Sequence, residues 1–123
     1  MPKKILVVDD EPCIVELFGK KLEMSGFIVI TAYSGEEALE KAKKELPDLI
    51  TLDIRLPGID GTKVFELLRQ DETTRNIPVI FITAVDAPRE IVHEFDLGAE
   101  NYLLKPVNPK VLVGQVEDIL VGN

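Results

Sequence analysis

Short runs of Val, Ile and Leu alternate along this chain with longer segments in which apolar residues recur every three or four positions. Runs of the first kind are typical of buried strands, and the longer spacing is typical of helices that pack one face on a core. The strands predicted in this way are residues 5–8, 27–31, 49–53, 79–83 and 101–104. The predicted helices are residues 12–24, 34–46, a segment around 64–68, residues 88–97 and a last segment that begins at 109.

These elements predict an α/β domain built on a parallel sheet. Strands that are apolar at nearly every position are buried on both faces, which requires helices above and below the sheet. Right-handed crossovers leave few ways to connect such strand and helix units. We therefore predict a doubly wound, flavodoxin-like fold in which residues 1–123 form a single domain. Its five-stranded parallel sheet has the order 2-1-3-4-5, with five helices on the two faces.

Polar residues stand at the carboxyl ends of four of these strands. They are Asp9 and Asp10, Asp53, Thr83 and Lys105. In an open parallel sheet the carboxyl ends share one edge, and ligands bind where the winding direction reverses between neighbouring strands. The sequence therefore predicts one site at this edge, with Asp9, Asp10 and Asp53 at the point of reversal.

The three carboxylates need a compensating charge, because two unit charges about 4 Å apart interact by roughly 4 kcal/mol at an effective dielectric of 20. Oxygen ligands favour Mg²⁺ or Mn²⁺ over softer metals. A phosphoryl group would complete the pattern, with the metal and Lys105 neutralising its oxygens and Thr83 donating a hydrogen bond. Asp53, on the central strand, is then the candidate nucleophile. We expect the nearby Glu11 and Asp60 to be turn and capping residues.

Four motifs carry a resemblance to a known family. They are ILVVDDE at residues 5–11, LDIRLPGIDG at 52–61, ITA at 82–84 and GAENYLLKP at 98–106. With these motifs nearly the whole chain resembles the receiver domain of response regulators in two-component signalling. The resemblance implies that Asp53 accepts a phosphoryl group, and that Asp9, Asp10 and the backbone carbonyl of Arg55 bind Mg²⁺.

The resemblance also implies how the signal is passed on. Lys105 is expected to pair with the phosphoryl oxygens, and its bond to Pro106 is expected to be cis, an isomer accessible chiefly before proline. Thr83 is expected to follow the phosphate and to couple to rotation of Tyr102. Phosphorylation would then reshape the face formed by the fourth helix, the fifth strand and the fifth helix.

The implied reaction is phosphotransfer onto the chain itself. The donor is a phosphohistidine on a histidine kinase or on a phosphotransfer protein, or a small donor such as acetyl phosphate, and the transfer depends on Mg²⁺. Water later hydrolyses the acyl phosphate slowly. The domain is expected to catalyse its own phosphorylation and dephosphorylation, and not to act as an enzyme on a separate substrate.

Composition narrows the partners and the location. With 14 basic and 22 acidic residues the net charge is −8, which argues against a grip on nucleic acid through its phosphates. No apolar stretch reaches the roughly 20 residues that cross a membrane, and no signal-like segment opens the chain, so we expect a cytoplasmic protein. Cys13, the single cysteine, is expected to be a helix residue without a chemical role.

Some positions differ from the pattern of dimerising, DNA-binding members of the family. Glu100 and Asn101 replace an acidic pair, and Lys110 is the one basic residue of the last predicted helix. These departures favour a monomer that acts in a phosphorelay or through protein contacts. A complete single-domain regulator and the receiver of a longer protein both fit this sequence.

Two other classes share the predicted fold. A haloacid dehalogenase-type phosphatase also uses an Asp nucleophile and Mg²⁺, and residues 59–62, IDGT, resemble part of its signature. That signature, however, has an Asp directly after a strand, where Gly58 stands here. A flavin- or nucleotide-binding module is the second alternative, although no GxGxxG or Walker sequence follows any predicted strand.

Overall fold

The computed structural model describes residues 2–83 and 102–121, which form five strands and four helices. The strands are β1 (Lys4–Val8), β2 (Ile28–Ala32), β3 (Leu49–Asp53), β4 (Val79–Thr83) and β5 (Tyr102–Leu104). The helices are α1 (Pro12–Met24), α2 (Gly35–Glu45), α3 (Gly61–Gln70) and α5 (Pro109–Val121). The helix predicted for residues 88–97 lies outside the described residues, as do Glu100 and Asn101.

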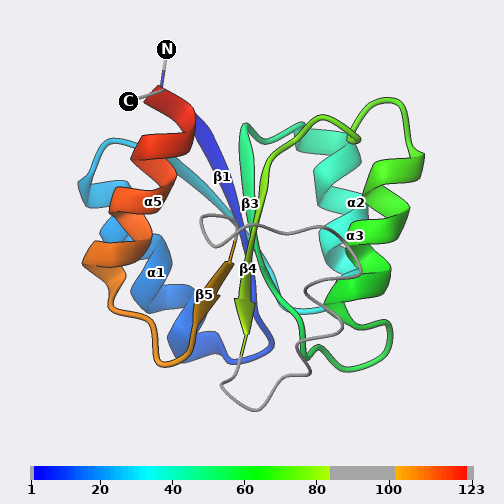
Figure 1. Ribbon diagram of the computed structural model, residues 1–123, viewed down its shortest axis with the longest axis horizontal. Coiled ribbons are helices and arrows are strands. Elements are labelled where there is room, and N and C mark those ends of the chain that lie inside the picture. The colour runs from blue at the N-terminus through cyan, green and yellow to red at the C-terminus, as the bar shows by residue number, and fades with distance from the viewer. Residues whose placement is uncertain (1, 84–101, 122–123) are drawn as a thin grey trace.

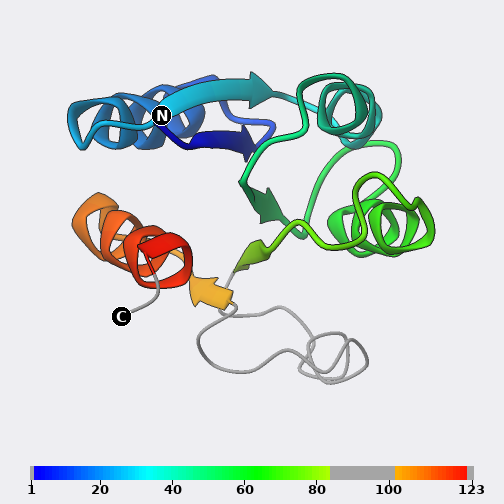
Figure 2. The same ribbon diagram turned by 90° about the horizontal axis from the view of Figure 1, so that it is seen from above.

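The strands form one parallel sheet in the order β2-β1-β3-β4-β5, which confirms the predicted topology. Helices α1 and α5 cover one face of the sheet, and α2 and α3 cover the other (Figure 1). Seen from above, the sheet is the middle of three layers (Figure 2). Because β1 is flanked by β2 on one side and β3 on the other, the winding reverses between β1 and β3.

Two clusters of buried side chains fill the space between the sheet and the helices. Along β1 the side chains alternate, with Ile5 and Val7 on the side of α1 and α5, and Leu6 and Val8 on the side of α2 and α3. All residues of β3 are buried, since this central strand has a neighbour on each edge and helices on both faces. Its last residue, Asp53, therefore belongs to a strand that is buried along its whole length.

Local signals set the starts of three helices. Ser34 caps α2 by accepting a hydrogen bond of 3.1 Å from the backbone N–H of Glu37. Asp60 caps α3 in the same way, accepting from the N–H of Lys63 at 3.0 Å. Pro12 occupies the first turn of α1, where its missing N–H costs nothing.

The second strand begins one residue later than predicted, at Ile28 instead of Phe27. The N–H of Phe27 donates to the carbonyl of Leu22 at 3.1 Å, so Phe27 still belongs to the closure of α1. Gly26 has the positive φ of 97° that this kind of helix ending requires. Because Phe27 is part of the turn that ends α1, β2 begins one residue later.

Two further expectations concern α1 and the membrane. Cys13 is a residue of α1, as predicted, but its side chain is exposed, in contrast to the usual burial of a free cysteine. Within the described ranges, no helix has both the length and the apolar character needed to cross a membrane.

Candidate functional site

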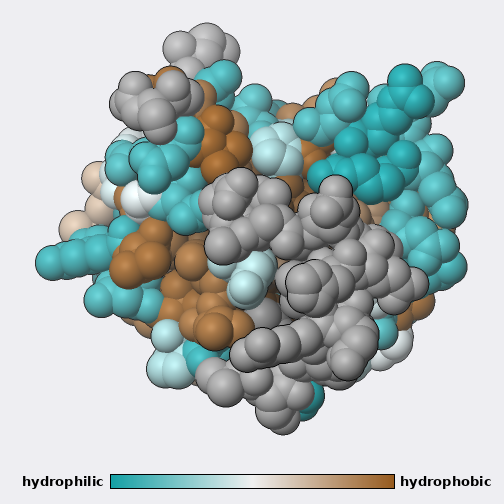
Figure 3. Space-filling model, in the orientation of Figure 1, coloured by the Kyte–Doolittle hydropathy of each residue, from teal (hydrophilic) through white to brown (hydrophobic). Residues whose placement is uncertain are grey.

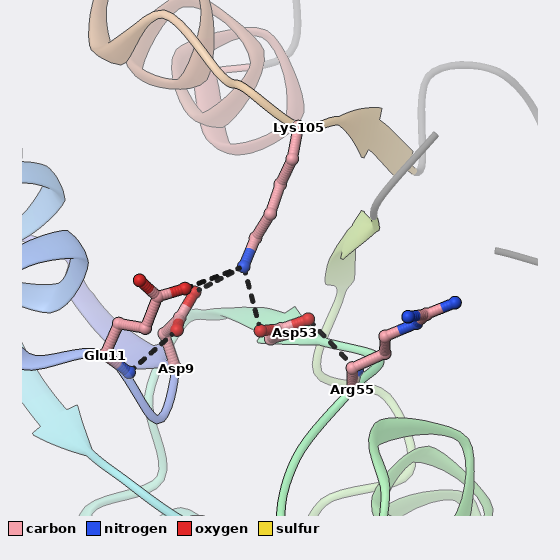
Figure 4. Close-up of polar contacts among 5 residues, drawn as sticks. All are labelled: Asp9, Glu11, Asp53, Arg55 and Lys105. Carbon is pink, nitrogen blue, oxygen red and sulfur yellow. Dashed lines mark hydrogen bonds and ion pairs between the residues drawn. The ribbon is translucent and has the colours of Figure 1, made fainter. Parts of the chain in front are cut away.

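The ends of β1 and β3 bring two buried carboxylates together. The register of these strands places Asp9, directly after β1, beside Asp53 at the end of β3. Asp9 is 2% exposed and Asp53 is 3% exposed. The backbone N–H of Glu11 donates to Oδ1 of Asp9, and that of Arg55 donates to Oδ1 of Asp53, both at 3.0 Å (Figure 4). Each carboxylate is thus oriented by the turn that follows its own strand.

Lys105 reaches this pair from the end of β5. Its ammonium nitrogen donates a hydrogen bond to Oδ2 of Asp53 at 3.0 Å. The same nitrogen lies 3.2 Å from Oδ2 of Asp9, a contact that is an ion pair without hydrogen-bond geometry. The bond between Lys105 and Pro106 is cis, as the family resemblance implies. One cation therefore bridges the two buried carboxylates (Figure 4).

Burial shifts the ionisation of both partners. Burial raises the pKa of Asp53 above its ordinary value; the hydrogen bonds from Lys105 and from the N–H of Arg55 lower it in part, and the charge of Asp9 raises it. Burial also disfavours the charged form of Lys105, but the hydrogen bond to Asp53 and the charges of Asp53 and Asp9 outweigh burial. The pKa of Lys105 therefore lies above its ordinary value. Lys105 is charged at neutral pH. The hydrogen bonds from Lys105 and from the N–H of Arg55 favour the ionised form of Asp53, against the effect of burial.

Asp9, Asp10 and Asp53 can offer oxygens to one cation. One carboxylate oxygen from each residue lies within 4.8 Å of the others, and Asp10 is the exposed member of the set. Oδ2 of Asp9 is buried and accepts no hydrogen bond from any residue of the described ranges. This buried oxygen faces the Lys105 ammonium at 3.2 Å, so it already lies where a positive charge is held, and a divalent cation would use it as a ligand. The oxygen-only donor set fits Mg²⁺ or Mn²⁺, while the ligand role of the Arg55 carbonyl stays a prediction.

Gly61 allows α3 to begin against the end of β3. A Cβ at this position would lie 2.3 Å from the carbonyl oxygen of Asp53 and 2.6 Å from Cα of Ile54. The N–H of Gly61 donates to the carbonyl of Ile54 at 2.7 Å, which holds the two segments together. Gly58, in the same loop, has a positive φ of 75°. The loop after Asp53 therefore depends on two glycines.

Thr83 and Tyr102 lie on the adjacent strands β4 and β5. Thr83 ends β4 and pairs with Leu104, the residue before Lys105. The prediction for Thr83 concerns its hydroxyl, and that side chain lies outside the described part of the structure. Tyr102 is half-buried and packs against the cluster on the side of α2 and α3. The predicted coupling between the two residues stays a prediction.

Glu11 belongs to this site, although its sequence position predicts only a turn or cap. Glu11 occupies the N-cap position of α1, as expected of a turn and capping residue, but its side chain accepts no capping hydrogen bond. Instead, Oε1 of Glu11 lies 4.0 Å from the Lys105 nitrogen. A glutamate directly after an acidic pair, at a position where Ser, Thr, Asp or Asn is the usual cap, is the signal that could have indicated this role.

A family model matches most of the chain. It is described as the response regulator receiver domain, and it matches residues 5–117. The matched region contains every residue of the candidate site, from Asp9 to Lys105.

Curated relatives extend this similarity. The alkaline phosphatase synthesis transcriptional regulatory protein PhoP of Bacillus subtilis is 48% identical over 120 residues, which are 98% of this chain and 49% of that protein. The response regulator PleD of Caulobacter vibrioides is 40% identical over 119 residues, which are 97% of this chain and 26% of that protein. The chain thus spans half or less of the length of these relatives.

Solved structures agree with the fold. A putative response regulator from Chloroflexus aurantiacus superposes with a TM-score of 0.87 at 38% identity, covering 98% of this chain and 99% of that one. The chemotaxis response regulator CheY4 of Vibrio cholerae has a TM-score of 0.86 at 29% identity, covering 97% of this chain and 99% of that one.

Proposed function

This chain belongs to the family of response-regulator receiver domains, and from that premise we propose that Asp53 is the residue that takes up the phosphoryl group. The function of the chain is that of a phosphorylation-controlled signalling switch. The observation that carries the assignment is the place of Asp53, a buried carboxylate at the end of the central strand, hydrogen-bonded to Lys105 and beside Asp9.

The transfer is a displacement at phosphorus. A carboxylate oxygen of Asp53 forms the new P–O bond, the P–N bond of the donor phosphohistidine breaks, and the imidazole leaves with the electron pair and takes up a proton. The N–H of Arg55 orients the Asp53 carboxylate before the reaction. Such orientation converts an encounter into a directed attack.

Asp9, Asp10 and Asp53 would hold Mg²⁺, with the carbonyl of Arg55 as a further ligand. When bound, the metal supplies positive charge that offsets the charge on the phosphoryl oxygens. The proposal is supported by the three carboxylate oxygens that lie within 4.8 Å of one another, and by the buried Oδ2 of Asp9, which accepts no hydrogen bond within the described ranges.

Lys105 would pair with the phosphoryl oxygens once Asp53 carries them. Its raised pKa keeps the ammonium charged, and its side chain is 25% exposed, so the ammonium can follow an added group without leaving the site. The same residues would support slow hydrolysis of the acyl phosphate by water. The chain would thus catalyse both its own phosphorylation and its return to the resting state.

Thr83 and Tyr102 would carry the change to a binding surface. A phosphoryl group that draws in Thr83 would free space for Tyr102 and alter the face around β5. Apolar side chains gather at the surface over β5 and the start of α5 (Figure 3). Leu104 and Val111 in these elements are 52% and 53% exposed, which suits contact with a protein.

The proposed donor is a histidine kinase or a phosphotransfer protein. The proposed output is contact with another protein, and PhoP, named as a transcriptional regulatory protein, suggests a second form of output in the control of transcription. The net charge of −8 argues against direct binding of nucleic acid by this chain. We also propose that the chain forms one domain, is a monomer and works in the cytoplasm.

The alternative classes gain no support. Gly58 stands where the haloacid dehalogenase-type signature has its Asp, and Asp60 caps α3. The family match lies with receiver domains, not with phosphatases or with flavin- or nucleotide-binding modules.

Intact-mass measurement tests the proposed function. Protein incubated with Mg²⁺ and acetyl phosphate should gain one phosphoryl group, and Asp53→Asn should gain none. Equal labelling of both proteins would place the nucleophile elsewhere.

A further inference from the structure

Lys105 is surrounded by three carboxylates of unequal exposure. Its nitrogen lies 3.0 Å from Asp53 and 3.2 Å from Asp9 on the inner side, and 4.0 Å from Oε1 of Glu11 on the outer side. The side chain of Glu11 is 59% exposed, whereas those of Asp9 and Asp53 are almost fully buried. Lys105 therefore has one neighbouring carboxylate that faces solvent (Figure 4).

The backbone of Glu11 is fixed on both sides. Its N–H donates to Oδ1 of Asp9 at 3.0 Å, and its carbonyl accepts from the N–H groups of Ile14 and Val15 at 3.0 and 3.2 Å. Its side chain does not cap α1, so the carboxylate is not committed to the helix. The backbone of Glu11 is thus held in place by hydrogen bonds, and its carboxylate lies within reach of Lys105.

The inner position of Lys105 conflicts with a cation on the acidic cluster. The ammonium lies against Oδ2 of Asp9 and Oδ2 of Asp53, and both residues are proposed metal ligands. Two cations a few ångströms apart repel strongly at a protein surface, and a divalent ion doubles that repulsion. A metal at these carboxylates would therefore push the ammonium outward, toward the side on which Glu11 lies.

We propose that Glu11 is a positioning residue that receives the Lys105 ammonium when a divalent cation binds to Asp9, Asp10 and Asp53. The inference rests on the proposed function, because it takes these three carboxylates as the metal ligands. Glu11 lowers the cost of moving Lys105 and keeps its charge close to Asp53, where an arriving phosphoryl group needs it.

A double-mutant cycle on Mg²⁺ affinity tests this role without any phosphotransfer. The dissociation constant is measured by NMR titration of the unphosphorylated protein, followed at the amides of Asp10 and Ile54. The proteins are wild type, Glu11→Gln, Lys105→Met and the double variant. Glu11→Gln should weaken Mg²⁺ binding by a factor about threefold larger when Lys105 is present than in the Lys105→Met background, a size set by an exposed ion pair.

Two more variants separate reach from charge. Glu11→Asp keeps the negative charge but shortens the side chain by one methylene, so its carboxylate falls short of Lys105. If Glu11 receives the Lys105 ammonium, this variant should bind Mg²⁺ more weakly than the wild type. If Glu11 acts only through its charge, the dissociation constant should equal that of the wild type. Glu16→Gln removes one charge from an exposed position of α1, the helix that follows Glu11, and should bind Mg²⁺ like the wild type. Thermal denaturation checks that each variant is folded.

The outcomes distinguish the inference from the function on which it rests. If the wild-type protein binds Mg²⁺ but Glu11→Gln weakens binding by the same factor with Lys105 and with Lys105→Met, the role of Glu11 is overturned and the metal site stands. A wild-type protein that binds no Mg²⁺ would overturn the metal site and the inference together.

Discussion

The ammonium nitrogen of Lys105 lies 3.0 Å from Oδ2 of Asp53, although the two residues are 52 positions apart in the chain. Lys105 follows the edge strand β5, and Asp53 ends the central strand β3, with β4 between them. The same ammonium also meets Asp9 after β1. The site therefore depends on the relative positions of several strand ends, and substitutions that shift one of them should disturb it.

Gly61→Ala is expected to destabilise the fold and to displace the end of β3. The added Cβ would lie 2.3 Å from the carbonyl oxygen of Asp53, a backbone atom that cannot move without its strand. Overpacking of this kind typically costs about 1–3 kcal/mol, which urea denaturation can measure.

Gly114→Ala is the matched control for Gly61→Ala. Gly114 lies within α5, and nothing in the described residues comes within 4 Å of a Cβ built there. Alanine in place of a helical glycine should raise the free energy of unfolding by about 0.5–1 kcal/mol. Equal stability changes in the two variants would mean that the close approach at Gly61 is wrong.

Asp53→Asn is expected to stabilise the protein at neutral pH before Mg²⁺ is added. Because burial raises the pKa of Asp53, its protonated form favours folding. That contribution is fully present below the unfolded pKa and is lost as the pH rises through the folded pKa. At pH 7 the buried charge therefore opposes folding, and asparagine removes it while keeping the shape.

We expect the gain from Asp53→Asn to be on the order of 1 kcal/mol at pH 7. It should shrink as the pH falls toward the ordinary aspartate value of about 3.9. Urea denaturation at several pH values, in the presence of a chelator, measures this difference. A variant less stable than the wild type at pH 7 would show that the contact with Lys105 outweighs burial.

Asp10→Asn is expected to remove stabilisation by Mg²⁺. Asp10 is the exposed member of the acidic cluster, so its replacement should not lower the free energy of unfolding before metal is added. A ligand at 100 times its dissociation constant stabilises the folded state by about 2.7 kcal/mol, and this increment should be lost. Asp118→Asn, at an exposed position of α5, should keep it. Full Mg²⁺ stabilisation of Asp10→Asn would exclude Asp10 as a ligand.

Asp60 is expected to matter for stability and not for phosphotransfer. Hydrogen bonds from Thr62 and from the N–H of Lys63 hold the pKa of Asp60 below its ordinary value. The contribution to stability is therefore present above the unfolded pKa and is lost as the pH falls through the folded pKa. Asp60→Ala should cost about 1 kcal/mol at pH 7, whereas Asp60→Asn keeps a good cap.

The Asp60 variants also separate the receiver from the phosphatase alternative. Asp60→Asn should accept a phosphoryl group at the wild-type rate. As the pH falls, the wild type should lose the stability that ionised Asp60 contributes, and Asp60→Asn should not show this loss. Denaturation between pH 5 and pH 3 and intact-mass kinetics provide the two readouts. Loss of phosphorylation in Asp60→Asn would indicate that Asp60 takes part in the chemistry.

The strand order and the meeting of Asp9, Asp53 and Lys105 could be predicted from the sequence. Continuous apolar runs specify strands that are buried on both faces, and parallel strands place their carboxyl ends on one edge. Under those two constraints, residues far apart in the chain have to converge. The prediction needed no knowledge of side-chain contacts.

Contacts between individual side chains could not be predicted from the apolar pattern or from the strand order. The approach of Glu11 to Lys105 depends on rotamers of two long side chains from opposite ends of the chain. The delayed start of β2 depends on a hydrogen bond from the N–H of Phe27 to Leu22, and apolar periodicity does not encode such a closure. The exposure of Cys13 likewise follows from the face of α1 on which it falls.

Chemical trapping of the acyl phosphate tests the identity of the nucleophile most directly. Borohydride reduces an aspartyl phosphate to homoserine, which peptide mapping by mass spectrometry locates in the sequence. After incubation with Mg²⁺ and acetyl phosphate, we expect homoserine in place of Asp53 and at no other aspartate. Homoserine in place of Asp9 or Asp10, or its absence from protein that has gained a phosphoryl group, would contradict the assignment of Asp53.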